Sequence, residues 1–228
     1  MTTHLGRVLA VLTGRAVPFG KPGAHSGIDK QPQRVPVRVE REGLFGDEQG
    51  DRRVHGGPEK AVHHYPHEHY ARWRHEIGER EVLLHPGAFG ENLHSEGVVE
   101  ADLCLGDRLR IGGTLLEVSQ SRQPCWKLNV RFGVPDMARR VQESRRTGWY
   151  YRVLQPGELQ AGDAIELVER PWREWSLIRI AQVLYARDVD PDETRALLAL
   201  PIVDSWRRRL ERRLETQRVE DWRSRLEG

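Results

Sequence analysis

The sequence predicts a mainly β fold with some α structure, in which a β-barrel is followed by a small unit of three helices. Short apolar segments, each ended by turn residues, recur at even spacing up to about residue 170. Such spacing with glycine-rich turns favours a closed barrel over a parallel sheet. Beyond Pro171 the apolar residues follow a helical period instead. We therefore expect a barrel domain over 1–170 and a three-helix domain over 171–228.

The strands of the first domain are predicted from alternation and from their flanking turns. Val35, Val37 and Val39 alternate with polar residues, as in a strand with one buried face. Gly112-Gly113 separates two of the segments and predicts a hairpin. The expected strands are Val8–Leu12, Val35–Val39, Glu81–Leu84, Arg108–Ile111, Leu115–Val118, Trp149–Leu154 and Ala164–Val168.

Only two helices are expected to interrupt this domain. The first, over 67–77, carries Tyr70, Trp73 and Ile77 at three- and four-residue spacing. The second, over 136–146, directs Met137 and Val141 inward. Neither resembles the crossover helix of a nucleotide-binding fold.

The second domain is expected to contain helices over 174–186, from 191 to Pro201, and over 203–214. Asp190 before Pro191 has the properties of an N-cap. A unit this small gains its stability by packing on the barrel or on a partner. The arginine-rich run over 207–213 has glutamates interleaved and next to it, and we interpret it as a solvated helix face.

Composition excludes several classes of protein. The 36 Lys and Arg residues nearly balance the 34 acidic residues, which argues against a nucleic-acid partner. The two cysteines are too few for a disulfide framework, a four-cysteine zinc module or an iron–sulfur cluster. No apolar run approaches the about 20 residues that span a bilayer, and the first residues lack the features of a signal peptide. We expect a soluble, cytoplasmic protein with no membrane partner.

Cys125 lies in the most informative segment, Ser119 to Lys127, where a strand ends in a proline-constrained loop. Arg122 and Lys127 flank it, and neighbouring cations favour the reactive thiolate. A buried, inert thiol is an equally good interpretation of the loop alone. Cys104 lies in an apolar run and is expected in the core.

Two glycine-rich segments could bind an anion through backbone amides. The first, His55-Gly56-Gly57-Pro58-Glu59-Lys60, adds a point charge at Lys60, and the second, 87–93, adds the Asn92 amide. A simple turn explains each segment as well. The histidines between 55 and 75 suggest a metal, but Pro66 separates His63 from His67 and no HExxH is present. A resident zinc site is therefore not favoured, and neither are the usual nucleotide and serine-hydrolase motifs.

Taken together, these segments resemble the MOSC-domain proteins of the YiiM type, and the resemblance extends over nearly the whole chain. The helical tail is similar to the three-helix appendage of that subfamily. The matching segments, in chain order, are Gly43–Asp47, His55–Pro58, Lys60–Val62, Glu68–Tyr70, Gly87–Leu93, Val118–Leu128 and Thr147–Tyr150.

The resemblance implies a barrel that holds the molybdenum cofactor, a molybdopterin with one metal. The family cysteine that ligates molybdenum falls on Cys125. Thiolate sulfur suits that metal, and His55 is a candidate proton source. The candidates for binding the pterin and its phosphate are Lys21, Gly56, Gly57, Lys60, Asn92 and Arg122.

The activity that the resemblance implies is reduction of N-hydroxylated compounds, such as hydroxylaminopurine-type bases, amidoximes and hydroxylamines, to amines or amidines plus water. No flavin motif is visible, so a separate flavoprotein-type reductase is expected to deliver electrons. A homodimer is plausible. Three alternatives remain open: a molybdopterin carrier without turnover, a sulfur-transfer protein, and a metal-independent enzyme that uses Cys125.

Overall fold

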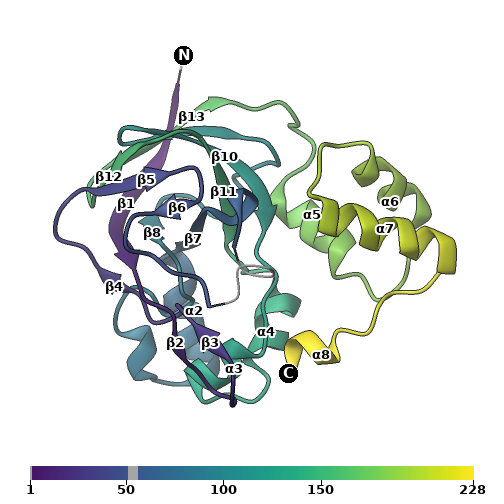
Figure 1. Ribbon diagram of the computed structural model, residues 1–228. Coiled ribbons are helices and arrows are strands. Elements are labelled where there is room, and N and C mark those ends of the chain that lie inside the picture. The colour runs from purple at the N-terminus through teal and green to yellow at the C-terminus, as the bar shows by residue number, and fades with distance from the viewer. Residues whose placement is uncertain (1, 51–55) are drawn as a thin grey trace.

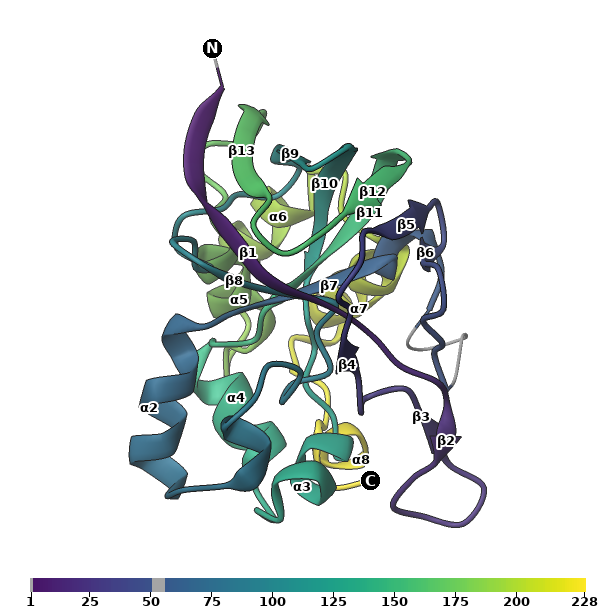
Figure 2. The same ribbon diagram turned by 90° about the vertical axis from the view of Figure 1, so that its left-hand side faces the viewer.

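This computed structural model describes residues 2–50 and 56–228. In this part of the chain, seven strands form a β-barrel. The hydrogen-bonded order is β13-β9-β10-β11-β7-β8-β1, and a further pairing of β13 with β1 closes the sheet on itself (Figures 1 and 2). Every pair is antiparallel except β7 with β8. The predicted barrel is therefore confirmed. The strands are β1 (Thr3–Thr13), β7 (Val62–Pro66), β8 (Leu93–Glu96), β9 (Arg108–Ile111), β10 (Thr114–Ser121), β11 (Trp149–Gln155) and β13 (Ala164–Glu169).

Alternation places one face of each strand inside the barrel. In β9, Leu109 and Ile111 are buried while Arg110 is exposed, and in β11 Trp149 and Tyr151 are buried on the same pattern. Burying a large apolar side chain contributes roughly 1.5–3 kcal/mol. Alternating sequence therefore fixes which face of the strand turns inward.

Shorter strands lie outside the barrel. They are β2 (Val17–Pro18), β3 (His25–Ser26), β4 (Gln31–Pro32), β5 (Val37–Glu40), β6 (Gly43–Leu44) and β12 (Gly157–Leu159). The strand expected from Val35 begins only at Val37, and Val35 is 67% exposed because it has no sheet to pack against. The strand expected over 81–84 was also wrong. That segment is a 3₁₀-helix, η2 (Glu81–Leu83), which directs Leu83 into the core.

The first domain holds more helices than the two predicted. Helices α2 (Glu68–Ile77) and α4 (Met137–Ser144) occur where expected, but the described residues add α3 (Lys127–Phe132) and the 3₁₀-helix η1 (Pro58–Lys60). Both additions are too short for a periodic pattern to reveal them. A second apolar core, which includes Trp73, Phe89 and Leu128, joins α2, α3 and α4 below the barrel.

The C-terminal unit packs against the barrel flank. It comprises α5 (Leu177–Leu184), α6 (Pro191–Leu198) and α7 (Asp204–Thr216), and the side chain of Asp190 caps α6 as predicted. Leu177, Ile180 and Trp206 belong to the same apolar core as the barrel strands. The three-helix unit is therefore confirmed, and it shares its core with the barrel.

One further helix returns from this unit to the barrel domain. Helix α8 (Arg223–Leu226) lies beside α3 and α4, with Leu226 buried in the second core (Figures 1 and 2). The expected solvated face over 207–213 needs one correction. Arg213 is only 3% exposed because its guanidinium donates to the carbonyls of Val183 and Leu184 and pairs with Glu220.

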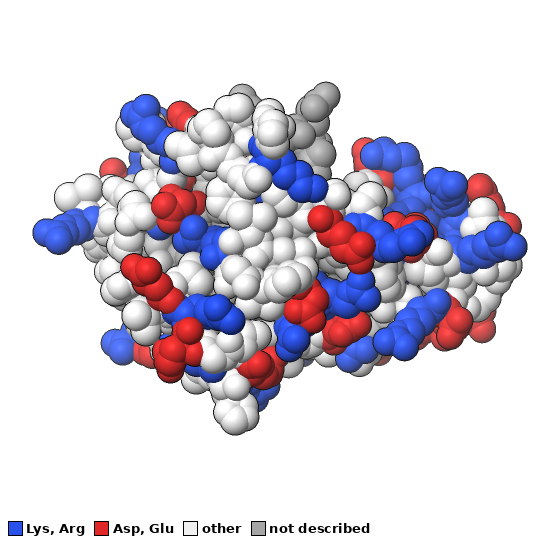
Figure 3. Space-filling model, turned by 90° about the horizontal axis from the view of Figure 1, so that it is seen from below, with Lys and Arg blue, Asp and Glu red and all other residues white. Residues whose placement is uncertain are grey.

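The surface carries charges of both signs. On the face seen in Figure 3, Lys and Arg lie beside Asp and Glu, on the C-terminal unit as well. None of the helices in the described part of the chain is long and apolar enough to cross a bilayer.

Candidate functional site

Cys125 lies where two adjoining cavities meet. The inner cavity has a volume of about 80 Å³ and the outer one about 600 Å³. Gly50, Lys60, Cys125, Lys127 and Tyr150 line both of them. The Cys125 side chain is therefore placed between a small cavity and a larger one, although only 9% of the residue is exposed.

The position of Cys125 follows from the end of β10. The Arg122 amide still pairs with the Gly148 carbonyl at 3.0 Å. Pro124 then interrupts the strand because proline has no amide hydrogen to donate. The Cys125 carbonyl accepts from the Leu128 amide at 3.0 Å, which begins α3. The thiol thus sits in the short turn between a strand end and a helix start.

Cations gather around this turn. Lys60 and Lys127 line both cavities, Arg122 lines the inner one, and Arg225 of α8 lines the outer one. Burial, with a smaller contribution from Arg209 of α7, lowers the pKa of Lys60. The Lys127 Nζ donates to the His25 carbonyl at 2.7 Å. These positive charges would attract an anionic ligand.

Asn92 joins the inner cavity to the barrel. Its Nδ2 donates to Asp47 Oδ2 at 2.9 Å and to the Leu12 carbonyl at 3.1 Å, and its Oδ1 accepts from the His63 amide at 3.0 Å. Asp47 also forms an ion pair with Lys30. Burial of Lys30 lowers its pKa. Because the protein itself engages both ends of the Asn92 amide, that side chain acts here as a brace between segments.

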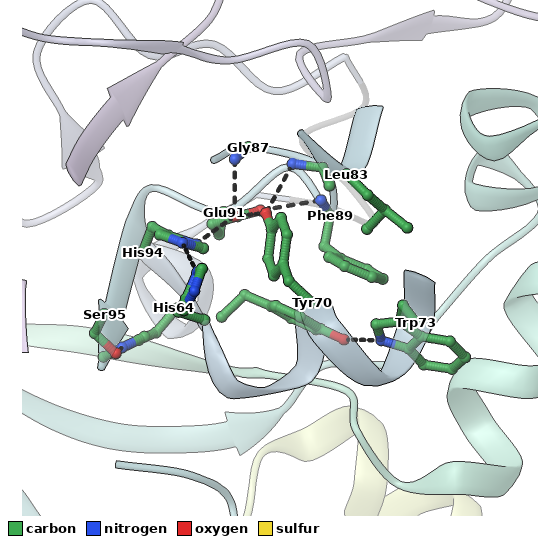
Figure 4. Close-up of polar contacts among 12 residues, drawn as sticks. His64, Tyr70, Trp73, Leu83, Gly87, Phe89, Glu91, His94 and Ser95 are labelled. Atoms are coloured by element: carbon green, nitrogen blue, oxygen red, sulfur yellow. Dashed lines mark hydrogen bonds and ion pairs between the residues drawn. The ribbon is translucent and has the colours of Figure 1, made fainter. Parts of the chain in front are cut away.

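The loop over 87–92 is held by a buried carboxylate. Glu91 is fully buried and accepts from the amides of Gly87 and Phe89 at 2.8 and 3.0 Å and from the Tyr70 hydroxyl at 2.5 Å (Figure 4). Burial alone would raise the pKa of Glu91. The hydrogen bonds to the carboxylate and the nearby His94, whose Nδ1 lies 3.2 Å from Glu91 Oε1, have the larger effect and lower this pKa to about 2. The ionised carboxylate thus fixes the loop that carries Asn92.

Several buried polar atoms in the cavity walls have no hydrogen-bond partner among the described residues. They are His63 Nε2, Arg122 Nη1 and Gln123 Nε2. Burial lowers the pKa of His63 to about 3, so the ring is neutral. The Gly90 backbone bonds the same ring. Buried polar atoms normally have a partner, and their clustering here indicates a ligand site.

The residues predicted from the sequence are only partly brought together. Lys60, Asn92, Arg122 and Cys125 line the inner cavity. Lys21 lies outside both linings, with its Nζ 4.9 Å from the centre of the Trp126 ring.

Of the predicted glycine segment, the structure describes only the part that follows His55. Gly57, at φ 92°, precedes η1, and its carbonyl accepts from the Lys60 amide at 2.9 Å. Gly56 and Gly57 line neither cavity, and His55 lies outside the described residues.

Sequence reasoning did not assign to the cofactor site several polar residues that line the cavities, among them Tyr150, Gln123, His63, Lys30 and Arg225. Tyr150 and Gln123 occur in segments that carry the family resemblance, so their position in those segments was an available indication. His63 was considered only as a metal ligand. Lys30 and Arg225 gave no local indication, because each reaches the site from a distant part of the chain. Among the described residues, no group of three or more His, Cys, Asp and Glu side chains is arranged to hold a metal ion.

Comparison with known proteins shows which families this chain matches. The MOSC domain family matches residues 51–166, and the family described as YiiM-like, 3-alpha helix domain matches residues 175–217. The chain therefore belongs to the MOSC domain family. Protein YiiM of Escherichia coli (strain K12) is 38% identical to this MOSC-domain chain over 221 residues, which cover 96% of the chain and 97% of YiiM.

Two further relatives of this MOSC-domain chain are informative. The crystal structure of YiiM from Escherichia coli matches with a TM-score of 0.80 and 32% identity, and the match covers 97% of this chain and 99% of that one. A protein of Gibberella moniliformis named Reductase is 39% identical over 206 residues, which cover 89% of this chain but 36% of that protein.

Proposed function

We propose that this protein is a molybdenum cofactor-dependent reductase of N-hydroxylated compounds, with Cys125 as the metal ligand. Membership of the MOSC domain family and a relative named Reductase support a reductase role. The observation that carries the proposal is the placement of one thiol at the junction of two cavities, surrounded by cations.

The residues present fit such a cofactor. A pterin offers amine and amide hydrogens as well as ring acceptors, and its side chain ends in a phosphate. The neutral His63 ring presents Nε2, and Arg122 Nη1 and Gln123 Nε2 present donors; none of these three atoms has a partner among the described residues. Leaving a buried polar atom without a partner costs about 1–3 kcal/mol of desolvation, and a bound pterin would supply the partners that these atoms lack.

Particular residues would hold each part of the group. Cys125 would bind the metal through its thiolate sulfur. Lys60, Arg122 and Lys127 would hold the anionic phosphate by charge and hydrogen bonds. Asn92 would act indirectly, since its amide already braces the cavity wall. Roles for Lys21, His55, Gly56 and Gly57 stay predictions.

The reaction adds two electrons and two protons to the N–O bond, so that an N-hydroxylamine becomes an amine and water. When bound, the molybdenum cofactor would supply the two electrons of this reduction. The outer cavity would orient the substrate beside Cys125, and the surrounding cations would stabilise developing negative charge on oxygen. A separate flavoprotein-type reductase would deliver the electrons.

The test is reductive turnover of benzamidoxime with reduced methyl viologen as electron donor. We expect turnover by wild type and by Cys104→Ala, whose cysteine lies away from both cavities. Cys125→Ala should lose at least about 100-fold, because mutating even a residue that only orients a metal ligand costs about 10–100-fold. Two results would overturn the proposal. Turnover by cofactor-free protein would indicate a metal-independent cysteine enzyme, and bound cofactor without turnover would indicate a carrier.

A further inference from the structure

The loop that carries Cys125 is tied to the last part of the chain on both sides of the cysteine, through the C-terminal unit and through helix α8. The Tyr185 hydroxyl at the end of α5 donates to the Arg122 carbonyl at 3.2 Å. The Arg225 Nη1 in α8 donates to the Pro124 carbonyl. The Trp126 amide donates to the Arg225 carbonyl at 2.8 Å. Residues 122, 124 and 126 are therefore each bonded by a residue more than 50 positions later in the chain.

Arg225 contributes most to this arrangement. Its Nη2 donates to Gln142 Oε1 at 2.5 Å, so one guanidinium bridges the cysteine loop and helix α4. Arg225 and Ser224 also form part of the outer cavity wall. Burial lowers the pKa of Arg225, which indicates that placing a cation here costs solvation energy. The planar guanidinium of arginine holds its donors in a fixed geometry, and it therefore suits this bridging position better than the single ammonium group of lysine.

Other contacts anchor α8 independently of Arg225. Leu226 is buried in the second core, and its carbonyl accepts from Asn129 Nδ2 at 2.7 Å. Glu227 pairs with Arg139 at 2.6 Å. The helix should therefore stay in place when only the Arg225 side chain is changed.

We propose that the C-terminal unit and helix α8 are together a structural part of the active site, in which Tyr185 and Arg225 are positioning residues that hold the Cys125 loop. The role of Cys125 as metal ligand rests on the proposed function, but the hold on its loop does not. Without these side-chain bonds the loop samples open conformations in which the thiol is exposed. In the native arrangement it stays at the junction of the cavities.

The test uses the full chain purified without cofactor and measures alkylation of Cys125 by iodoacetamide at one fixed pH, with the labelled peptides counted by mass spectrometry. Cys104, which is buried, reports general loosening in the same sample. The variants are Arg225→Lys, which keeps the charge but loses the fork, and Tyr185→Phe, which removes only the hydroxyl. Arg223→Lys is the matched control, since Arg223 lies in the same helix, is exposed and pairs with Asp221.

We expect Cys125 in Arg225→Lys and in Tyr185→Phe to react about fivefold faster than in wild type, the population change that loss of one hydrogen bond produces. Arg223→Lys should match wild type, and Cys104 should stay unreactive throughout. The proposal is overturned if both test variants react within about twofold of wild type, or if Cys104 accelerates by the same factor. Since this readout needs no molybdenum, it stands or falls separately from the proposed function.

Discussion

Replacing Glu91 with glutamine tests whether a buried charge holds the loop beside the site. Glutamine has nearly the shape of a protonated glutamate, but its NH₂ group cannot accept the bonds that the carboxylate accepts from Gly87, Phe89 and Tyr70. The substitution therefore removes the charge and turns at least one acceptor into a donor that faces donors.

The pKa shift of Glu91 sets the magnitude. The shift from 4.5 to about 2 means that the folded protein favours the ionised form. At roughly 1.4 kcal/mol per unit, this corresponds to about 3 kcal/mol of stability. Because the folded pKa lies below the unfolded one, the contribution is complete above pH 4.5 and is lost as the pH falls toward 2.

Urea unfolding of wild type and Glu91→Gln at pH 7 and at pH 3 measures this contribution. We expect the variant to be less stable by about 3 kcal/mol at pH 7, and the difference to shrink at pH 3. A difference below about 1 kcal/mol at pH 7, or one of equal size at both pH values, would refute the reasoning.

Two further predictions concern buried side chains elsewhere. Arg213→Ala should destabilise the protein by about 3 kcal/mol or more, because two helix carbonyls and Glu220 lose their partner. Thermal unfolding should show this loss, whereas Arg212→Ala, at an exposed neighbouring position, should change little. The pKa of His63 is about 3 in the folded chain against an ordinary value of 6.5, so the unfolded chain binds the extra proton between those values. Stability should thus decrease as the pH falls below 6.5, by up to about 1.4 kcal/mol per pH unit. In His63→Gln the slope should be smaller by that amount, and equal slopes from urea titrations at pH 4 to 7 would count against a buried neutral ring.

The barrel strands could be predicted because the sequence features that specify them lie within or next to each strand. Alternating residues such as those of β9 and β11 specify which face is buried, and glycine turns specify where each strand ends. Asp190 could likewise be recognised as a cap from its neighbours alone. Short elements such as α3 and η2 escaped prediction because one or two turns of helix leave no periodic pattern.

The site was predictable only in part. Cys125 and Arg122 share one segment, so the composition of that loop pointed to both residues. Lys30 and Arg225 reach the cavities through tertiary packing. Lys30 lines the inner cavity and forms an ion pair with Asp47. Arg225 lines the outer cavity because helix α8 returns from the far end of the chain. Long-range contacts of this kind are not encoded in the spacing of residues along the sequence.

Metal analysis of protein from a host that makes molybdopterin tests the central claim most directly. Wild type, Cys125→Ala and Cys104→Ala would be purified in parallel and assayed for molybdenum, pterin and their electronic spectra. We predict close to one molybdenum per chain in wild type and in Cys104→Ala, and loss of the metal or an altered spectrum in Cys125→Ala. Zinc in place of molybdenum, or neither metal nor pterin in any of the three proteins, would contradict the assignment of Cys125 as a molybdenum ligand.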